Sequence, residues 1–364
     1  MTAEAESELD RLVAERAQAL LDETVGENLD QLAILDVQGD DLVRTLHRAA
    51  RALEAEPLTL SAGRALVGRL SAGDRVLVLT GFLTPLPETD GLVGSAVLAL
   101  SMERGLGVLP VFAAEREVLP PLRAALRAAG LNVCEGLDQT ADIPHPAVVL
   151  EFPHDRSDAE LTAAALSEAI QPAACVAVER PGANPKGEYH FSGGRNVTRW
   201  IAPIDLLYDR VKSAGALTIG IGDRGNELGL GAIGDVVRME TPAGANCGCG
   251  CGLGNACMTP ADHTIVATTS DWGAYALSAA LSHLKGDPGA LISGEAYRRV
   301  LHEAVQGGAI DGPTKYAAPF IDGVDDVFNS HLLELMRGAV TYPRRSAAGA
   351  PTRSFRARRR LAGD

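Results

Sequence analysis

The stretch from Ala216 to Gly231, ALTIGIGDRGNELGLG, decides the fold of this 364-residue chain. Its first part, Leu217 to Ile221, is an apolar run typical of a strand covered on both faces of a sheet. Glycines then recur at short intervals, and Asp223, Asn226 and Glu227 lie among them. A buried strand whose following loop carries carboxylates and an amide is the usual way in which an α/β protein builds a site.

The same loop fits the Gly-x-Gly-x-x-Gly pattern of dinucleotide-binding proteins, with Glu240 at about the offset of a ribose-binding acid. A bound pyrophosphate, however, needs bare backbone N–H groups and a positive helix terminus. Asp223 lies inside the pattern and Glu227 just after it, and both would repel phosphate unless a metal ion intervened. Acids on a glycine-rich loop suit a cation or an ammonium group better, and their plain alternative is to cap a helix or face water.

The composition argues against two classes of partner, nucleic acids and membranes. The net charge of −14 argues against a nucleic-acid partner. We also expect a cytoplasmic protein with no membrane partner, because no apolar run approaches the length of a bilayer span and the N-terminal segment is acidic, unlike a signal peptide. Positive charge gathers at the C-terminus, where residues 341–364 hold seven arginines and one aspartate. This segment is predicted to be a basic disordered tail.

Strand-like and helix-like segments alternate through the middle of the chain. The strands read as continuous apolar runs, which predicts an α/β fold with a mostly parallel sheet and helices on both faces, a Rossmann-like three-layer arrangement. The predicted strands cover 76–80, 107–113, 131–135, 147–152, 174–179, 217–221 and 263–270. The predicted helices that follow them include 95–104, 119–130, 158–170, 274–284, 295–305 and 329–337.

Three parts are predicted along the chain. Residues 1–56 form an N-terminal helical arm, because leucines and valines recur there at helical spacing. Residues 57–340 form the α/β catalytic domain, and residues 341–364 form the tail. The arm is expected to pack on the domain or on a partner subunit, so a homo-oligomer formed through the arm is also predicted.

Four of the six cysteines gather in a glycine-rich insertion at residues 245–258, at Cys247, Cys249, Cys251 and Cys257. In a cytosolic chain such a group favours thiol or metal chemistry over disulfides. The spacing is not that of a zinc ribbon, yet cysteines two residues apart could hold a soft metal such as Zn²⁺. A reduced glycine-rich loop is the alternative. Cys134 and Cys175 lie in apolar runs and are expected in the core.

Polar residues follow several of the predicted strands. Because the carboxyl ends of parallel strands share one edge of a sheet, these residues could converge there, depending on the strand order. Thr89 and Asp90 could instead cap the helix that follows them. The residues expected at the edge are Asp90, Glu179, Arg180, Asp223, Asn226, Glu227, Ser270 and Asp271.

These motifs resemble the C-terminal domain of the D-glutamate cyclase family. The similarity runs from about residue 75 to 340 and is most specific between Gly222 and Gly231. It also includes Glu88-Thr89-Asp90-Gly91, Glu179-Arg180, Pro203-Ile204-Asp205 and Ser270-Asp271-Trp272-Gly273. Relative to the family pattern, Arg224 replaces a glycine, Asp271 replaces an asparagine, and the cysteine-rich segment looks inserted.

The resemblance implies a lyase that interconverts D-glutamate and 5-oxo-D-proline with loss or gain of water. It implies a bound Mn²⁺ or Mg²⁺, which oxygen ligands select and which would make a carboxylate electrophilic. Asp223, Glu227 and Asp90 are the metal ligands implied, and the catalytic set is Asp223, Asn226, Glu227 and Arg180. Arg180 would pair the substrate's α-carboxylate. Substrate contacts are expected from Glu179, Asp90, Thr89, Tyr189, Ser270, Asp271 and Trp272.

Several alternatives stay open. Arg224 could stand in for the cation, and His190 could act as a catalytic acid, whereas His263 opens a strand and is expected to be structural. Two other functions also fit the residues. One is a metal-dependent hydrolase of a lactam or amide on a related amino-acid substrate. The other is a non-catalytic protein that binds a metal or an amino acid.

Overall fold

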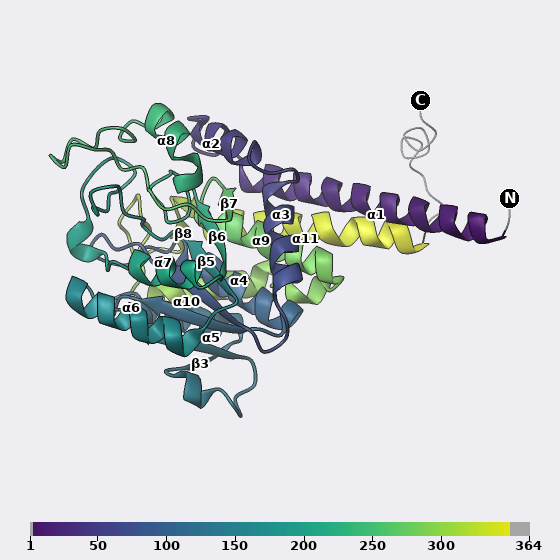
Figure 1. Cartoon of the computed structure of the whole chain (residues 1–364), viewed down its shortest axis with the longest axis horizontal. Helices are drawn as coiled ribbons and strands as arrows, with labels where there is room; N and C mark the ends of the chain where they lie inside the picture. Colours follow the sequence, from purple (N-terminus) through teal and green to yellow (C-terminus); the bar gives the residue numbers. More distant parts are fainter. Residues whose placement is uncertain (1–2, 350–364) are drawn as a thin grey trace.

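The computed structural model describes residues 3–349. Seven strands form one parallel sheet in the order β3-β4-β2-β1-β5-β6-β7, and helices cover both of its faces (Figure 1). The three-layer α/β fold predicted from the sequence is therefore confirmed. The strands are β1 (Arg75–Thr80), β2 (Leu109–Ala114), β3 (Asn132–Cys134), β4 (Pro146–Glu151), β5 (Ala174–Val178), β6 (Leu217–Gly222) and β7 (His263–Val266).

The central strand β1 divides the hydrophobic core in two. Val76 and Val78 point to one face of the sheet and Leu77 and Leu79 to the other, and all four are fully buried. This double burial explains why the strand reads as an unbroken apolar run. The larger core lies under α3 (Leu58–Arg69), α4 (Leu92–Leu106), α5 (Leu119–Ala129), α9 (Ser270–Lys285) and α10 (Gly294–Gln306). The smaller core lies under α6 (Arg156–Ile170) and α7 (Asp205–Ser213).

The N-terminal arm is built into the larger core. It consists of α1 (Ala3–Ala33) and α2 (Leu42–Arg51), and Val25, Leu29 and Leu46 belong to the same core as the strands. The outer part of α1 runs beside α11 (Asp326–Gly349) beyond the sheet (Figure 1). Oligomerisation through this arm stays a prediction. Among residues 3–349, no helix has the length and apolar character to cross a membrane.

The C-terminal segment differs from its prediction. Helix α11 continues through Pro343 to Gly349, although disorder was expected from residue 341. The expectation rested on positive charge, but arginine and alanine are good helix formers, so charge alone does not end a helix. The rest of the predicted tail lies outside the described residues. Elements that the sequence did not reveal are α3, α8 (Gly234–Glu240) and the hairpin β8 (Phe320–Ile321) with β9 (Val324–Asp325).

The strand order fixes where a site can form. The chain leaves β1 toward β2 on one side, and β5 pairs with β1 on the other side. The loops after β1 and β5 therefore diverge, and the crevice between them at the carboxyl edge is where open α/β sheets bind ligands. Strand β6 lies next to β5, so its glycine-rich loop reaches the same crevice.

The glycines after β6 allow the loop to fold back onto its own strand. Gly229 has a φ of +103°, and a Cβ there would lie 2.6 Å from the Cα of Gly220. The returning loop pairs with the segment after β5, since the backbone N–H of Leu228 donates to the carbonyl of Arg180 at 2.7 Å. These glycines thus serve close backbone packing, a use different from holding a phosphate.

A buried ion pair ties the strand ends together below the crevice. Arg180 and Glu115 are both fully buried, and the two terminal nitrogens of Arg180 donate to the two carboxylate oxygens of Glu115 at 2.6 and 2.7 Å. The same guanidinium donates to the carbonyls of Gly81 at 3.1 Å and Ala202 at 2.9 Å. One side chain therefore joins the ends of β1, β2 and β5.

Removing one partner of this pair should destabilise the fold strongly. Glu115→Ala leaves the Arg180 charge buried without its counter-ion, so the free energy of unfolding in urea should fall by about 3–5 kcal/mol. The matched control is Glu151→Ala, which breaks the exposed pair with Arg116 and should cost less than about 1 kcal/mol. Equal losses in the two variants would contradict a bracing role for the buried pair.

Candidate active site

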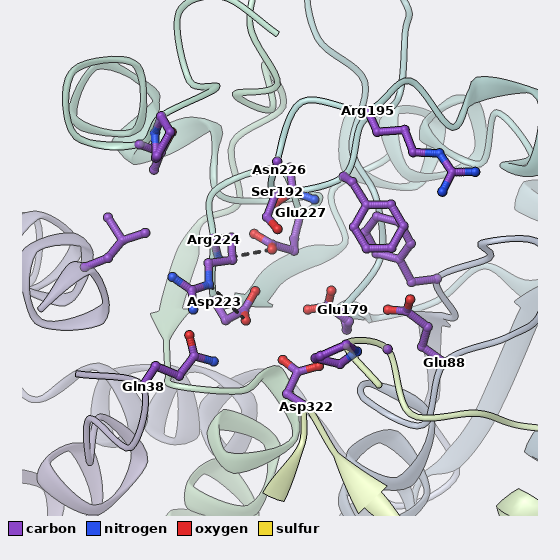
Figure 2. A pocket seen from close by; sticks show the side chains of 18 of the residues that line it. Gln38, Glu88, Glu179, Ser192, Arg195, Asp223, Arg224, Asn226, Glu227 and Asp322 are labelled. Atoms are coloured by element: carbon purple, nitrogen blue, oxygen red, sulfur yellow. Dashed lines mark hydrogen bonds and ion pairs between the residues drawn. The ribbon is translucent and has the colours of Figure 1, made fainter. Parts of the chain in front are cut away.

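A cavity of about 730 Å³ opens at the carboxyl edge of the sheet. The loops after β1, β5 and β6 all reach it, together with the hairpin β8–β9 and the linker between α1 and α2. Figure 2 shows carboxylates from several of these segments directed into the same space. The acids that line the cavity are Asp40, Glu88, Glu179, Asp223, Glu227 and Asp322.

Asp223 lies at the centre of the acidic cluster. Oxygens of Glu179, Asp223 and Glu227 approach one another within 4.8 Å, and so do oxygens of Asp90, Asp223 and Asp322. Asp223 is the member common to both groups. Four of these five carboxyls are buried, and Asp322 is half-buried. The strand order thus gathers acids that lie more than two hundred residues apart in the sequence.

Burial and mutual repulsion oppose the ionisation of these acids. Burial, followed by the charges of Glu179 and Glu227, raises the pKa of Asp223 well above its ordinary value. Burial raises the pKa of Glu179 in the same way, helped by Glu227 and Asp90. The pKa of Asp322 is raised by burial and by Asp90. A site of this kind favours whatever brings positive charge, either a metal cation or an ammonium group.

The loop after β6 fixes two of the side chains. Glu227 accepts hydrogen bonds from the backbone N–H groups of Gly225 at 2.7 Å and Arg224 at 3.1 Å. The amide nitrogen of Asn226 donates to the carbonyl of His190 at 3.0 Å. Its amide oxygen is buried and accepts no hydrogen bond within the described part of the chain. An uncommitted oxygen beside several carboxylates suits a hard cation.

Two of the acids occupy an unusual backbone conformation. Glu179 has a φ of +44° and Asp322 a φ of +50°. Residues other than glycine seldom adopt this region, and such strain, roughly 1–3 kcal/mol each, clusters at functional sites. The hydroxyl of Ser270 donates to Glu179 at 2.5 Å and helps to hold its carboxylate.

Asp90 and Asp271 cap each other's helices. Asp90 accepts from the backbone N–H groups of Ser270 at 3.1 Å and Asp271 at 2.8 Å, at the start of α9. Asp271 accepts from those of Gly91 at 2.8 Å and Gly94 at 2.7 Å, at the start of α4. Capping of α4 was the alternative considered for Thr89 and Asp90. Asp90 does accept from the Gly91 N–H at 3.0 Å, and Asp271 provides the further bonds to Gly91 and Gly94. Burial raises the pKa of Asp271 to about 7.

Several residues expected at the site do not line the cavity. The Arg180 guanidinium is held by Glu115, so it is not available to pair a substrate carboxylate, and this expectation is corrected. The Tyr189 hydroxyl donates to Asp205 at 2.5 Å, Trp272 to Asn329 at 2.6 Å, and Thr89 to the Phe320 carbonyl at 2.6 Å. Ser270 and Asp271 do not line the cavity but bind residues next to it, Ser270 through Glu179 and Asp271 through the backbone of Gly91. The predicted residues that line the cavity are Glu179, Asp223, Asn226 and Glu227.

Sequence reasoning missed much of the cavity wall, including the charged residues Lys315 and Asp322. Lys315 lies 3.1 Å from Glu88 and 4.8 Å from the centre of the Phe191 ring, and it brings positive charge to the wall. Asp322 enters from the turn of the β8–β9 hairpin, and its Asp-Gly sequence is a hairpin signal that could have been used. Glu88 lies in the motif Glu88-Thr89-Asp90-Gly91 but was given no role, whereas Lys315 lies in no pattern that marks it as a cavity residue.

Arg224 divides its charge between two acids. It pairs with Asp40 of the arm at 2.7 Å, and its Nε lies 3.8 Å from Asp223. Although burial opposes it, the charges of Asp223 and Asp40 raise the pKa of Arg224. Arg224 therefore compensates only part of the cluster, which leaves Glu179 and Asp322 open to a further positive group.

The cysteine loop is assembled differently from its prediction. Cys247, Cys249 and Cys251 lie together with His190, whose Nε2 is 3.3 Å from the Cys249 sulfur. Cys257 is fully buried and does not belong to this cluster, so its expected membership was wrong. The position of His190 beside these sulfurs leaves it outside the lining of the acidic cavity. His263 has a structural contact, with Glu54 at 2.8 Å.

Comparisons with known proteins agree with this architecture. A family model described as D-glutamate cyclase-like, C-terminal, matches residues 29–337. The human protein D-glutamate cyclase, mitochondrial, is 30% identical over 225 residues, which cover 58% of this chain and 33% of the human protein. The chain thus matches about a third of the length of that relative. The family match begins upstream of residue 75 and includes α2 and α3. The chain belongs to the D-glutamate cyclase-like family, through the C-terminal domain that defines it.

Proposed function

We propose that the chain is a metal-dependent lyase that interconverts D-glutamate and 5-oxo-D-proline with loss or gain of water. The observation that carries the proposal is the cavity in which carboxylates surround Asp223 while Lys315 stands on the wall. Glutamate has an ammonium group that suits the carboxylates and an α-carboxylate that suits Lys315. Family membership and the name of the human relative support the same reaction.

The cluster fits a hard divalent cation. Asp223 would hold it together with Glu179 and Glu227, or with Asp90 and Asp322, because each set brings its oxygens within 4.8 Å. The expected ligands Glu227 and Asp90 therefore belong to different sets that share Asp223. Oxygen donors select Mg²⁺ or Mn²⁺. When bound, such a cation would polarise the γ-carboxylate and stabilise the oxyanion formed by amine attack.

The remaining wall would orient the substrate. Lys315 replaces Arg180 as the proposed partner of the α-carboxylate, since it lines the cavity and Arg180 does not. The rings of Phe82 and Phe191, 5.0 Å apart, offer an apolar face for the methylene groups of glutamate. Charge at both ends and an apolar middle match a short acidic amino acid.

Where Asp90, Asp223 and Asp322 hold the cation, Glu179 is free to act as the proposed proton carrier. Ring closure moves two protons from the ammonium nitrogen to one oxygen of the γ-carboxylate, which then leaves as water. Burial raises the pKa of Glu179, and a base whose pKa lies nearer to neutrality is more effective in proton transfer. The same carboxyl can carry both protons, one after the other, from the nitrogen to the departing oxygen, which leaves as water.

Asp223→Asn should abolish most of the activity, because it removes the carboxylate common to both ligand sets. We expect turnover of D-glutamate to 5-oxoproline with Mn²⁺ to fall by about 10²-fold or more, measured by chromatography of both compounds. Asp235→Asn, an exposed change on α8, is the matched control and should keep full activity. Wild-type turnover and an unchanged response to Mn²⁺ in Asp223→Asn would contradict the proposed ligand set.

Assays with both enantiomers of glutamate and of 5-oxoproline separate the functions considered. Interconversion with Mn²⁺ supports the lyase. Opening of other lactams or amides without glutamate turnover would support the hydrolase. Ligand binding without turnover of any of these compounds would support a non-catalytic protein.

Lys315→Met should raise the KM for D-glutamate by about 10-fold or more while changing kcat less, because the α-carboxylate loses its charge partner. Steady-state kinetics measure the effect. Lys186→Met, an exposed change, controls for loss of general positive charge. A lower kcat with an unchanged KM in Lys315→Met would contradict this role.

The cation should stabilise the protein more as the pH rises. Without it, the raised pKa values of Glu179, Asp223 and Asp322 mean that the folded state binds more protons than the unfolded state. The stability that these bound protons contribute is fully present below the pKa values of the unfolded chain. It is lost as the pH rises through the pKa values of the folded protein. Mn²⁺ replaces those protons, so the gain in Tm should be larger at about pH 8 than at about pH 5.

Thermal scans with Mn²⁺ or a chelator at the two pH values measure this difference. Asp223→Asn serves as the matched variant, in which the gain at the higher pH should shrink. A gain that is independent of pH in the wild-type protein would contradict cation binding by these carboxyls.

A further inference from the structure

A second cluster of ligand-type side chains lies apart from the carboxylates. His190, Cys247, Cys249 and Cys251 bring one ligand atom each to within 4.8 Å of one another. His190 comes from the long loop after β5, whereas the cysteines follow α8. All three thiols are free, with no disulfide among them. The chemistry of this set is soft, in contrast to the all-oxygen set around Asp223.

The glycines between the cysteines have a conformational purpose. Gly248, Gly250 and Gly252 have φ values of +70°, +95° and +78°, and a Cβ at each would have open space around it. It is therefore the left-handed backbone, and not crowding, that requires glycine at these positions. This repeated turn curls the loop so that alternate side chains gather on one side, which a regular strand or helix would not achieve.

The separations lie within about 1 Å of the edges of a four-ligand zinc site. The sulfur of Cys247 lies 2.9 Å from that of Cys249 and 3.5 Å from that of Cys251. The Nε2 of His190 lies 3.3 Å from Cys249 and 4.0 Å from Cys251. Tetrahedral Zn²⁺ with its usual bond lengths needs sulfur–sulfur edges of about 3.8 Å and sulfur–nitrogen edges of about 3.5 Å. Shifts of less than about 1 Å in this glycine-rich loop would satisfy both.

Neighbouring N–H groups are directed at the sulfurs. Asn184 donates to Cys251 at 3.5 Å and Asn196 to Cys249 at 3.9 Å, and the backbone N–H of Cys249 donates to Cys247 at 3.3 Å. Such donors stabilise thiolates, the form that binds metals. His190 is 1% exposed, and its Nδ1 has no hydrogen-bond partner among the described residues. The placement of the ring therefore depends on what Nε2 faces.

We propose that His190, Cys247, Cys249 and Cys251 bind one structural Zn²⁺. Three thiolates and an imidazole complete a tetrahedron and leave no position for a substrate, which is the pattern of a structural zinc site. The proposal goes beyond the reaction at the acidic cavity and does not depend on it.

The zinc site would fix one wall of the cavity. The His190 carbonyl accepts from Asn226, and the carbonyls of Phe191 and Ser192 accept from Asn255 at 3.1 and 2.8 Å. Phe191, Ser192 and Asn226 line the cavity. A metal that holds His190 therefore holds the segment that shapes the entrance to the carboxylates.

Elemental analysis of the full chain, purified with a reductant and without chelator, tests the site directly. We expect about one zinc per chain in the wild-type protein. Cys249→Ser and His190→Asn should lose most of it. Cys257→Ala, a change in the same loop that does not touch the cluster, is the matched control and should keep the metal. Elemental analysis distinguishes zinc from the Mn²⁺ or Mg²⁺ proposed for the cavity. The zinc proposal and the proposed function can therefore be contradicted independently of each other.

Substitution with Co²⁺ gives a second measurement that does not rely on the stability of the variants. Wild-type protein and the Cys257→Ala variant, each produced in cells grown with Co²⁺, should have similar absorption spectra. We expect a thiolate-to-cobalt charge-transfer band and the intense visible bands of tetrahedral Co²⁺. Wild-type protein that binds neither Zn²⁺ nor Co²⁺ under reducing conditions would overturn the proposal. A Cys249→Ser variant that keeps its full zinc content would also overturn it. The same holds if wild-type protein purified under reducing conditions contains a disulfide within the loop.

Discussion

The structure depends on the close approach of like charges at one point of the sheet edge. Asp223 belongs to two groups of carboxyls, most of them buried, and Glu179, Glu227 and Asp322 make its ionisation harder. Such a gathering is costly unless protons, a cation or an ammonium group offset it. The rest of the cavity can be understood as the framework that keeps these acids together in spite of their repulsion.

That framework consists of contacts between strand ends and helix starts. The Arg180–Glu115 pair holds the ends of β1, β2 and β5 in register. Asp90 accepts from backbone N–H groups at the start of α9, and Asp271 accepts from those at the start of α4, so each carboxylate links the two helices. These side chains are ionisable and lie near the cavity, yet their hydrogen-bonding capacity is largely taken up by the protein itself.

The fold could be predicted from the sequence because strand burial leaves a local signature. The central strands are apolar runs, and the loop after β6 carries both of its acids within five positions, Asp223 to Glu227. The site was harder to predict, because the strand order decides which ends meet. Arg180 and Glu179 are neighbours in sequence, but only Glu179 faces the cavity, since the left-handed backbone there turns the two side chains apart. Lys315 and His190 reach their sites through irregular loops, whose paths leave no periodic pattern.

The pairing of Asp40 with Arg224 connects the N-terminal arm directly to the acidic cluster. Arg224 has one guanidinium to share between the linker after α1 and the central acid Asp223. A fragment cut to the strands and their helices alone would lack Asp40, and Arg224 could then swing fully toward Asp223. The arm thereby sets how much negative potential the crevice retains, and the choice of the first residue of an expressed fragment becomes a choice about its electrostatics.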